Sequence, residues 1–251
     1  MNNSRSPKLS IITVCFNEAK RIKETCESIV NQTFQDFEWI VLDGGSTDGT
    51  VEILSQYRNR MSYFKSAPDE GIYFAMNEGI EKAIGEYCLF LNGGDSLFNE
   101  TSLMEVSKYL NGLEPILIGG VIQINDQKRY TYILEKWWKV HFLFYAPPHQ
   151  ATFYLSKALK VMNGYNTSYK IIADVDLDLR LIDAGLRIKS IPVIVSNFYL
   201  DGVGSQESIL QRFERRRLDY QHFGIFYSLI FRYFGRPLIQ ILFFMRRILR
   251  P

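Results

Sequence analysis

The sequence contains little cysteine. Cys15, Cys26 and Cys88 are the only three in 251 residues, and neither their number nor their spacing matches a disulfide framework or a zinc site. Each lies in an apolar stretch, where cysteine behaves as a small hydrophobic residue. We therefore expect three reduced, buried thiols, and their scarcity argues against a small disulfide-stapled scaffold.

Long apolar runs are missing as well. The uncharged run at 237–245 is flanked by two arginines and is much shorter than the roughly 20 residues that span a bilayer. Residues 1–10 contain two basic side chains and no apolar stretch before the first strand-like run, so they do not resemble a secretory signal. We expect a cytoplasmic protein.

The formal net charge is only +2, but it is unevenly distributed. Residues 211–251 contain nine arginines against Glu214 and Asp219, a net charge of +7, which leaves −5 for residues 1–210. Binding to nucleic acid needs a broad basic footprint, so the acidic remainder argues against nucleic acid as a partner. Hydrophobic residues make up 47% of the chain and charged residues 22%, which is typical of a folded globular protein.

Runs with strand and helix periodicity alternate along the chain. The pattern predicts strands at 9–14, 37–42, 63–64, 87–91 and 116–124, and helices at 20–31, 50–58, 72–83 and 174–184. The segment at 151–155 is an apolar stretch after a rigid turn. The order of strands and helices is typical of an α/β fold, a mostly parallel sheet with right-handed crossovers and flanking helices. Ligands collect at the carboxyl ends of such strands, so the loops at Asn17, Asp43 and Asp95 should meet at one face.

Asp43 ends one of the buried strands and is followed by Gly44 and Gly45. Glycine lets the backbone approach a ligand closely, and a carboxylate in this position can accept hydrogen bonds from a nucleotide base or ribose. The alternative is an aspartate that only stabilises the turn. For Asp48, which precedes Gly49, we favour that alternative and expect a cap on the next helix.

Asp95 ends the segment Asn92-Gly93-Gly94-Asp95, which follows the predicted strand at 87–91. A carboxylate at the end of a central strand suits Mg²⁺ or Mn²⁺ shared with diphosphate oxygens. Such a metal offsets the charge that develops on a departing nucleoside diphosphate. The alternative is an Asn-Gly turn in which Asp95 caps a helix.

Asp174, Asp176 and Asp178 fall within one and a half helical turns. Transfer of a sugar to a hydroxyl with inversion requires a base that takes the proton of the acceptor. We assign that role to Asp174, for which the alternative is a helix N-cap. Asp176 and Asp178 are expected to face solvent or to pair with Arg180.

His149 and Gln150 follow two prolines, which restrict the backbone at this point. A rigidly placed histidine suits contact with a metal, a phosphate or the acceptor. The alternative is a turn that is structural only.

The ordered motifs resemble the family 2 glycosyltransferases, inverting enzymes that use nucleotide sugars and have the GT-A fold, a Rossmann-like α/β unit. The segments that carry the resemblance are LSIITVCFNE at 9–18, ESIVNQ at 27–32, WIVLDGGSTDGT at 39–50, DEGIYFAMNEGI at 69–80, GEYCLFLNGGD at 85–95 and DVDL at 174–177. Each segment alone has low specificity for the family, but the set in this order is specific for it.

The resemblance implies a role for each motif. The residues that would bind the nucleotide sugar are Thr13, Asn17, Glu18, Asp43, Asp69, Asn77 and Asn92. Asp95 matches the last acidic position of the family's metal-binding Asp-x-Asp motif, and Asp174 matches the catalytic base. The resemblance also implies the bacterial polysaccharide and lipopolysaccharide branch, with a UDP-sugar as the expected donor and a lipid-linked or saccharide acceptor.

The family pattern fades beyond about residue 205. We therefore divide the chain into a GT-A domain at 1–205 and a basic amphipathic helical extension at 206–251. Apolar residues recur in the extension at helical spacing: Ile225, Phe226, Leu229, Ile230, Tyr233 and Phe234. A helix of this kind suits a membrane interface, so we expect peripheral attachment to the inner face of the cell membrane. The alternative is a helix packed on the catalytic domain or on another copy. Arg215, Arg216 and Arg217 could instead contact a phosphate.

Two other functions stay open from the sequence. A nucleotidyltransferase also binds a nucleotide and a metal, but no glycine-rich loop with a phosphate-binding Lys or Arg follows Val14. A catalytically silent subunit could hold a lipid-linked sugar for a partner. Replacement of Asp174 by Asn distinguishes this subunit from an enzyme, because in an enzyme it should abolish sugar transfer and leave nucleotide binding intact.

Overall fold

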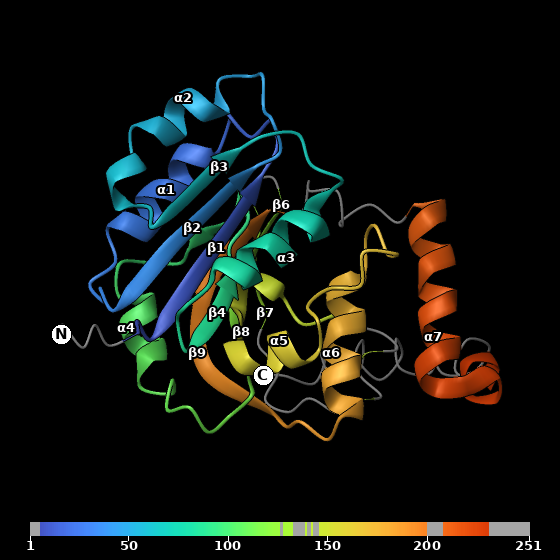
Figure 1. Ribbon diagram of the computed structural model, residues 1–251. Helices are drawn as coiled ribbons and strands as arrows, with labels where there is room; N and C mark the ends of the chain where they lie inside the picture. The colour runs from blue at the N-terminus through green and yellow to red at the C-terminus, as the bar shows by residue number, and fades with distance from the viewer. Residues whose placement is uncertain are drawn as a thin grey trace.

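A computed structural model describes residues 6–125, 128–132, 139, 142, 146–199 and 208–230 (Figure 1). In this part of the chain one sheet has the strand order β3-β2-β1-β4-β8-β6-β9-β5, and β7 pairs with β6. The strands are β1 (Leu9–Cys15), β2 (Phe37–Asp43), β3 (Tyr63–Ser66), β4 (Tyr87–Phe90), β5 (Ser96–Leu97), β6 (Ile116–Asn125), β7 (Lys128–Tyr132), β8 (Thr152–Leu155) and β9 (Ile188–Tyr199). The helices are α1 (Ile22–Val30), α2 (Thr50–Ser55), η1 (Arg58–Arg60), α3 (Ile72–Lys82), α4 (Ser102–Ser107), η3 (His149–Ala151), α5 (Ser156–Val161), α6 (Ala173–Asp183) and α7 (Ile209–Ile230).

The first half of the sheet confirms the predicted α/β unit. Strands β3, β2, β1 and β4 are parallel to one another, and helical segments connect them in the predicted order. Helices α1 and α2 lie on one face of these strands, and α3 lies on the other (Figure 1). The helix predicted at 50–58 is shorter, because α2 ends at Ser55 and the chain continues into the 3₁₀ turn η1.

The second half of the sheet is mixed. Strand β8 lies antiparallel between β4 and β6, and β5 pairs antiparallel with β9, whereas β6 and β9 are parallel. The sequence predicts a strand at 116–124 and only an apolar stretch at 151–155, and it predicts no direction for either segment. Antiparallel neighbours do not need a helical crossover, so the alternation of helices and strands gives no signal for them.

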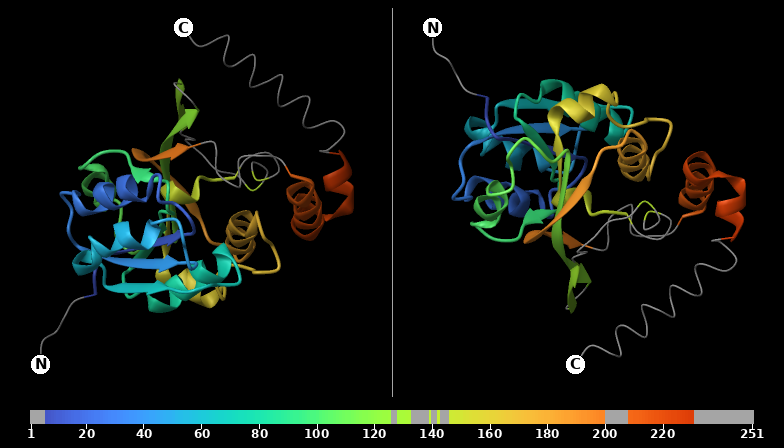
Figure 2. Two further views of the ribbon diagram at one scale, coloured as in Figure 1. Left: turned by 90° about the horizontal axis from the view of Figure 1, so that it is seen from above. Right: turned by 90° about the horizontal axis from the view of Figure 1, so that it is seen from below.

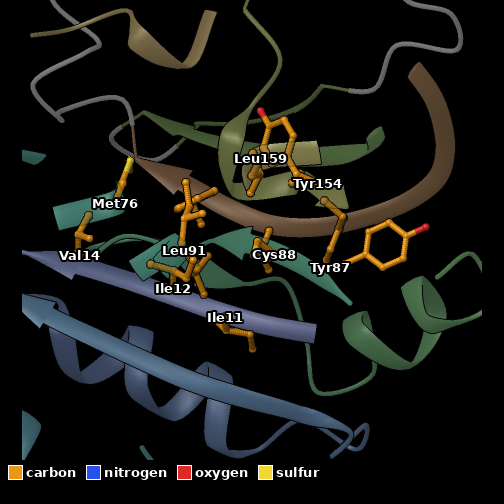
Figure 3. Packing of buried hydrophobic residues seen from close by; sticks show 14 of the residues in the cluster. Ile11, Ile12, Val14, Met76, Tyr87, Cys88, Leu91, Tyr154 and Leu159 are labelled. Atoms are coloured by element: carbon orange, nitrogen blue, oxygen red, sulfur yellow. The ribbon is translucent and has the colours of Figure 1, made fainter. Parts of the chain in front are cut away.

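The core lies where α3 and α5 cover the centre of the sheet. Figure 3 shows Met76 of α3 near Ile12 and Val14 of β1, and Leu159 of α5 near Tyr154 of β8. Close packing of α3 on β1 depends on a missing side chain, because a Cβ atom at Gly79 would lie 2.5 Å from Ile12 Cγ2. The three cysteines are free and buried, as predicted.

Helix α7 lies beside α6, on the side away from the parallel strands (Figures 1 and 2). Its inward side chains Glu214, Leu218 and Asp219 are buried. The Tyr169 hydroxyl donates to Gln221 Oε1 at 3.3 Å. The described part of the predicted extension therefore packs on the α/β domain, which was the alternative for this segment.

The other predictions for the extension fall outside the described residues. These are the domain boundary at 205–206, the apolar side chains from Ile225 to Phe234 and the arginines that follow. Helix α7 is interrupted at Gly224, which has a φ of 75°. Among the helices that the structure describes, none combines the length and the apolar character that crossing a membrane requires.

His222 makes the contact between α7 and α6 dependent on pH. Its Nδ1 lies 2.8 Å from Asp183 Oδ2, and its Nε2 lies 3.5 Å from Asp176 Oδ1. Lys139 pairs with Asp183, and Arg180 pairs with Asp176. Burial acts to lower the pKa of His222, but the two carboxylates outweigh it and raise the pKa above its ordinary value.

We expect His222→Gln to destabilise the protein more at pH 6 than at pH 9. A histidine with a raised folded pKa contributes its full stabilisation below the unfolded pKa of about 6.5 and loses it as pH rises through the folded pKa. The loss at pH 6 should be roughly 1.5–3 kcal/mol, the range for a hydrogen bond to a charged group. Thermal unfolding followed by circular dichroism compares the stability of the wild type with that of His222→Gln. An equal difference between them at the two pH values would contradict this role.

Candidate active site

The loops that follow β1 and β2 hold each other in place, as predicted. Asn17 N–H donates to Ser46 Oγ at 2.7 Å, and Thr47 N–H donates to Asn17 Oδ1 at 3.0 Å. Asn17 has a φ of 54°, a conformation that asparagine tolerates better than most residues. Glu18 N–H donates to Thr50 Oγ1 at 2.8 Å. Asn17 and Glu18 thus lie at the junction of the two loops.

Asp43 organises the loop after β2. It is only 2% exposed, and it accepts the N–H groups of Gly45 at 3.1 Å and Ser46 at 2.9 Å. It also accepts the hydroxyls of Ser46 and Ser66. Burial acts to raise the pKa of Asp43, but these donors outweigh it and hold the pKa below its ordinary value. Asp43 therefore shapes the loop at 44–49 as a carboxylate, and its direct contact with a nucleotide stays a prediction.

Asp48 stabilises the turn before α2, as predicted, but the N-cap residue of that helix is Gly49. Asp48 Oδ1 accepts the N–H of Thr50 at 3.1 Å, at the start of α2, and its Oδ2 accepts the N–H of Ala19 at 3.0 Å. Asp48 therefore joins α2 to the loop after β1. This is a structural role.

Thr13, Asn77 and Asp69 differ in how free their side chains are. The Thr13 hydroxyl is buried and accepts Trp39 Nε1–H at 3.0 Å. The Asn77 amide bonds twice to the backbone of Tyr165, at 2.7 and 2.9 Å, and so ties α3 to the segment before α6. Asp69 lies against the loop at 44–49, because a Cβ atom on Gly44 would be 3.1 Å from its Oδ2. Of these three predicted nucleotide ligands, Asp69 has the most suitable position.

Asp95 is a buried carboxylate in the turn after β4. Its N–H donates to Asn92 O at 3.1 Å, and its side chain is 8% exposed. Burial raises the pKa of Asp95 to about 7, although His149 and Arg21 act to lower it. The loop after β1 reaches this turn, since a Cβ atom on Gly94 would lie 3.3 Å from Glu18 Oε2. Asp95 does not cap α4, which begins at Ser102.

Asn92, His149 and Asp174 form a bridge across the site. Asn92 Nδ2 donates to His149 Nε2 at 3.1 Å, and His149 Nδ1 lies 3.7 Å from Asp174 Oδ2. Burial acts to lower the pKa of His149, but Asp174 and Asp95 outweigh it and raise the pKa. Asn92 Oδ1 is buried without a hydrogen-bond partner. The bridge therefore joins the turn predicted to bind metal to the predicted base, and it leaves one oxygen available to a ligand.

Asp174 lies in the first turn of α6, where the helix dipole favours a carboxylate. Ile172 is the N-cap residue, so the alternative role of Asp174 as N-cap is not realised. Its Oδ1 accepts the N–H of Val175 at 2.9 Å, and its side chain keeps 19% exposure. A hydroxyl can therefore approach the Asp174 carboxylate.

Asp176 and Asp178 were expected to face solvent or to pair with Arg180; both are buried, and the expectation is confirmed for Asp176 by its ion pair and is wrong for Asp178. Asp176 does pair with Arg180, whose Nε lies 2.7 Å from Asp176 Oδ2. Asp178 accepts the Tyr154 hydroxyl at 2.7 Å, and burial raises the pKa of Asp178 well above its ordinary value. Helix α6 is covered by the sheet on one side and by α7 on another, which helical spacing in the sequence could not reveal.

The turn after β4 has the chemistry for a divalent cation that arrives with a diphosphate. Asp95 offers one carboxylate, and Asn92 offers its unpartnered buried oxygen. Mg²⁺ often binds through one or two carboxylates and completes its shell with phosphate oxygens and water. Within the described residues, no three His, Cys, Asp or Glu side chains gather closely enough to hold a metal by themselves.

His149 and Gln150 are adjacent in the sequence, but only His149 contacts other predicted site residues. Gln150 is 1% exposed, so its predicted contact with acceptor or phosphate has no support from its position.

The structure also adds two groups that the sequence did not single out. Arg21 lies close enough to Asp95 to affect the pKa of Asp95, and the Tyr73 hydroxyl donates to Ile171 O at 2.6 Å. The only feature of the sequence that indicated a site role for Arg21 is its place as a basic residue in the polar turn after the first strand. No feature of the sequence indicated such a role for Tyr73.

Comparisons with known proteins agree on one family. The model of the family described as "Glycosyl transferase family 2" matches residues 10–170. A "PGL/p-HBAD biosynthesis glycosyltransferase" of Mycobacterium bovis is 30% identical over 220 residues, which cover 84% of each chain. A "Cholesterol galactosyltransferase" of Borreliella burgdorferi is 37% identical over 101 residues, 39% of this chain and 28% of the relative. Asp174 lies just beyond the matched range of the family model.

Solved structures show the same fold. S. aureus TarS 1–349 in complex with UDP superposes with a TM-score of 0.70 at 20% identity, over 86% of this chain and 65% of the TarS chain. The mannosyltransferase PcManGT of Pyrobaculum calidifontis, in complex with GDP-Man and Mn²⁺, gives a TM-score of 0.60 at 18% identity. It is matched over 87% of this chain and 62% of its own. These similarities show the GT-A fold.

We expect Asp43→Asn to destabilise the protein and to weaken UDP binding. The amide replaces one acceptor oxygen by an NH₂ group that faces the donors of the loop, at a cost of roughly 1–3 kcal/mol. UDP affinity should fall roughly tenfold, equivalent to about 1.4 kcal/mol. Urea unfolding and titration calorimetry with UDP measure the two effects at pH 7, well above the lowered pKa of Asp43.

Asp36→Asn is the matched control for this change. Asp36 is exposed and accepts one long hydrogen bond, from Lys8 N–H at 3.3 Å. The control should leave both quantities close to wild type. Wild-type UDP affinity in Asp43→Asn would show that Asp43 does not shape the nucleotide site.

Proposed function

The chain belongs to glycosyl transferase family 2, and we propose that it is an inverting enzyme that moves a sugar from a UDP-sugar to an acceptor hydroxyl. The acceptor is a lipid-linked sugar or a saccharide, and the process is the synthesis of bacterial cell-surface polysaccharide or lipopolysaccharide. The observation that carries the proposal is the bridge from Asn92 through His149 to Asp174. This bridge supports the proposed role of Asp174 as a base close to a turn that suits a diphosphate.

The reaction is a single displacement at the anomeric carbon. Asp174 takes the proton of the acceptor hydroxyl while the acceptor oxygen forms its bond to that carbon. The bond from the anomeric carbon to the diphosphate oxygen breaks, and the nucleoside diphosphate leaves with the electron pair from the opposite face. His149, whose Nδ1 lies 3.7 Å from Asp174 Oδ2, orients the carboxylate.

The donor side is formed by the loops after β1, β2 and β4. Asn17, Glu18 and Asp43 shape the nucleoside end, with Asp69 beside the loop at 44–49. Asn92 and Asp95 would hold Mg²⁺ or Mn²⁺ together with the diphosphate. When bound, such an ion offsets the negative charge that develops on the leaving group. The Mn²⁺ in the mannosyltransferase complex is consistent with this assignment.

The similar proteins support the choice of substrates. TarS structures contain UDP or UDP-GlcNAc, which favours a uridine nucleotide. The name of the Borreliella burgdorferi relative specifies a sterol as the acceptor of a galactosyl group, which favours a lipid acceptor. The sugar and the linkage depend on contacts that a donor screen can identify.

A donor screen tests the proposed function. Wild-type protein is incubated with UDP-glucose, UDP-galactose, UDP-N-acetylglucosamine or GDP-mannose, with Mg²⁺, Mn²⁺ or EDTA, and release of the nucleoside diphosphate is measured. We expect release from a UDP-sugar and much less with EDTA. Asp174→Asn should lower turnover at least about 100-fold, the range for loss of a general base, and leave UDP affinity within about twofold.

Asp36→Asn is again the control and should retain full turnover, because Asp36 is an exposed carboxylate of the same type. Wild-type turnover in Asp174→Asn would refute the mechanism. Retained binding of UDP with no turnover in any variant would instead favour a silent binding subunit.

We also propose that the protein attaches peripherally to the inner face of the cell membrane through its C-terminal segment. The outward side of α7 supports this proposal within the described residues. Ile209 is 87% exposed and Phe213 is 66% exposed, and Arg216 follows at the spacing that keeps it on the same side of the helix. Apolar and arginine side chains on one helix face suit the boundary between acyl chains and anionic head groups.

Vesicle sedimentation at moderate salt tests the attachment. Removal of residues 221–251 should release the protein from phosphatidylglycerol vesicles, and Phe213→Asp in the full chain should weaken binding about tenfold or more, since a buried Phe contributes roughly 1.5–3 kcal/mol. Leu113→Asp is the control, because Leu113 is 74% exposed but lies far from α7 in the sequence. Unchanged sedimentation of the shortened chain would show that the segment is not an anchor.

A further inference from the structure

A buried carboxylate of α7 holds the segment that leads into α6. Glu214 is 4% exposed. Its Oε1 accepts the N–H of Lys170 at 2.6 Å, and its Oε2 accepts the N–H groups of Ile171 at 3.0 Å and Ile172 at 3.3 Å. Hydrogen bonds to an ionised acceptor are stronger than those between neutral groups. The clamped segment ends two residues before Asp174.

The clamp fixes the start of the helix that carries the base. The N–H groups at and before a helix start have no acceptor among that helix's own carbonyls. Glu214 therefore supplies acceptors that α6 cannot. The Tyr73 hydroxyl of α3 donates to Ile171 O at 2.6 Å. Ile171 is therefore held at both of its backbone polar groups, by α7 at the nitrogen and by α3 at the oxygen.

Other contacts prevent α7 from moving independently of this segment. Arg217 donates to Ser168 Oγ at 3.3 Å, and its guanidinium lies 4.9 Å from the centre of the Tyr169 ring. His222 contacts Asp176 on the next turn of α6. Helix α7 thus contacts residues on both sides of Asp174 in the sequence.

We propose that Glu214 is a positioning residue for sugar transfer, which fixes the Asp174 carboxylate relative to the acceptor hydroxyl. This inference rests on the proposed role of Asp174 as the base. Misplacement of a reacting group by about 1 Å can cost about 100-fold in rate. The contacts that shape the donor loops come from other residues, so loss of Glu214 should lower kcat and leave donor binding almost unchanged.

The experiment compares four variants of the full chain: Glu214→Ala, Glu214→Gln, Leu218→Ala and Asp174→Asn. UDP release from UDP-glucose, UDP-galactose or UDP-N-acetylglucosamine gives kcat and KM, calorimetry with UDP gives Kd, and thermal unfolding gives Tm. Leu218 is fully buried on the same helix, so Leu218→Ala removes packing from α7 and keeps the carboxylate. It separates positioning from simple loss of stability.

We expect Glu214→Ala to lower kcat about 100-fold, with the donor KM and the Kd for UDP within about twofold of wild type. Glu214→Gln can keep an oxygen at the position that serves Ile171 and Ile172, so its loss should be smaller, about tenfold. Leu218→Ala should lower Tm and retain kcat within about threefold. If Glu214→Ala does not fold, the kcat of Glu214→Gln decides by the same criterion.

Two results would overturn the positioning role while the proposed function stands. One is a wild-type kcat in the Glu214 variants when Asp174→Asn is inactive. The other is an equal loss of kcat in Leu218→Ala and Glu214→Ala at equal Tm, which would indicate general destabilisation. A chain with no turnover, or one in which Asp174→Asn is fully active, would instead overturn the proposed function itself.

Discussion

The contact of His149 with Asn92 and Asp174 makes one site from two distant parts of the chain. Asn92 follows β4, and His149 directly precedes β8. Because β4 and β8 are neighbours in the sheet, the turn after one lies beside the turn before the other. The first turn of α6 then brings Asp174 to the same place. This contact therefore joins the loops proposed to bind the donor to the proposed base, Asp174.

Buried carboxylates are stabilised in different ways in this protein. Four donors hold Asp43 ionised despite burial. Burial raises the pKa of Asp95 to about 7, so this group is sensitive to an added cation. Asp178 keeps a raised pKa beside the Tyr154 hydroxyl. A low pKa suits a carboxylate that shapes a loop, and a raised pKa near neutrality suits a carboxylate whose charge a bound metal ion would stabilise.

Helix α7 links the C-terminal segment to both proposed tasks of the protein. Its inward side meets α6 through Glu214 and His222, close to the base. Its outward side presents Ile209 and Phe213, which suit a lipid surface. Under the proposed function, a lipid-linked acceptor would approach Asp174 beside the helix that we propose to lie on the membrane. The predicted amphipathic pattern ran from Ile225 to Phe234 and indicated neither of these sides, and a buried glutamate in a basic helix has no distinctive sequence signal.

The sequence by itself determined the parallel strands, their helices and the polar loops at Asn17, Asp43 and Asp95, because these features depend on residues that are close together in the chain. Tertiary structure alone decided the direction of β8, the burial of Asp178 and the contact of Glu214 with the start of α6. These features join segments tens of residues apart, and the burial of a side chain depends on what covers it. Local periodicity contains no information about that cover.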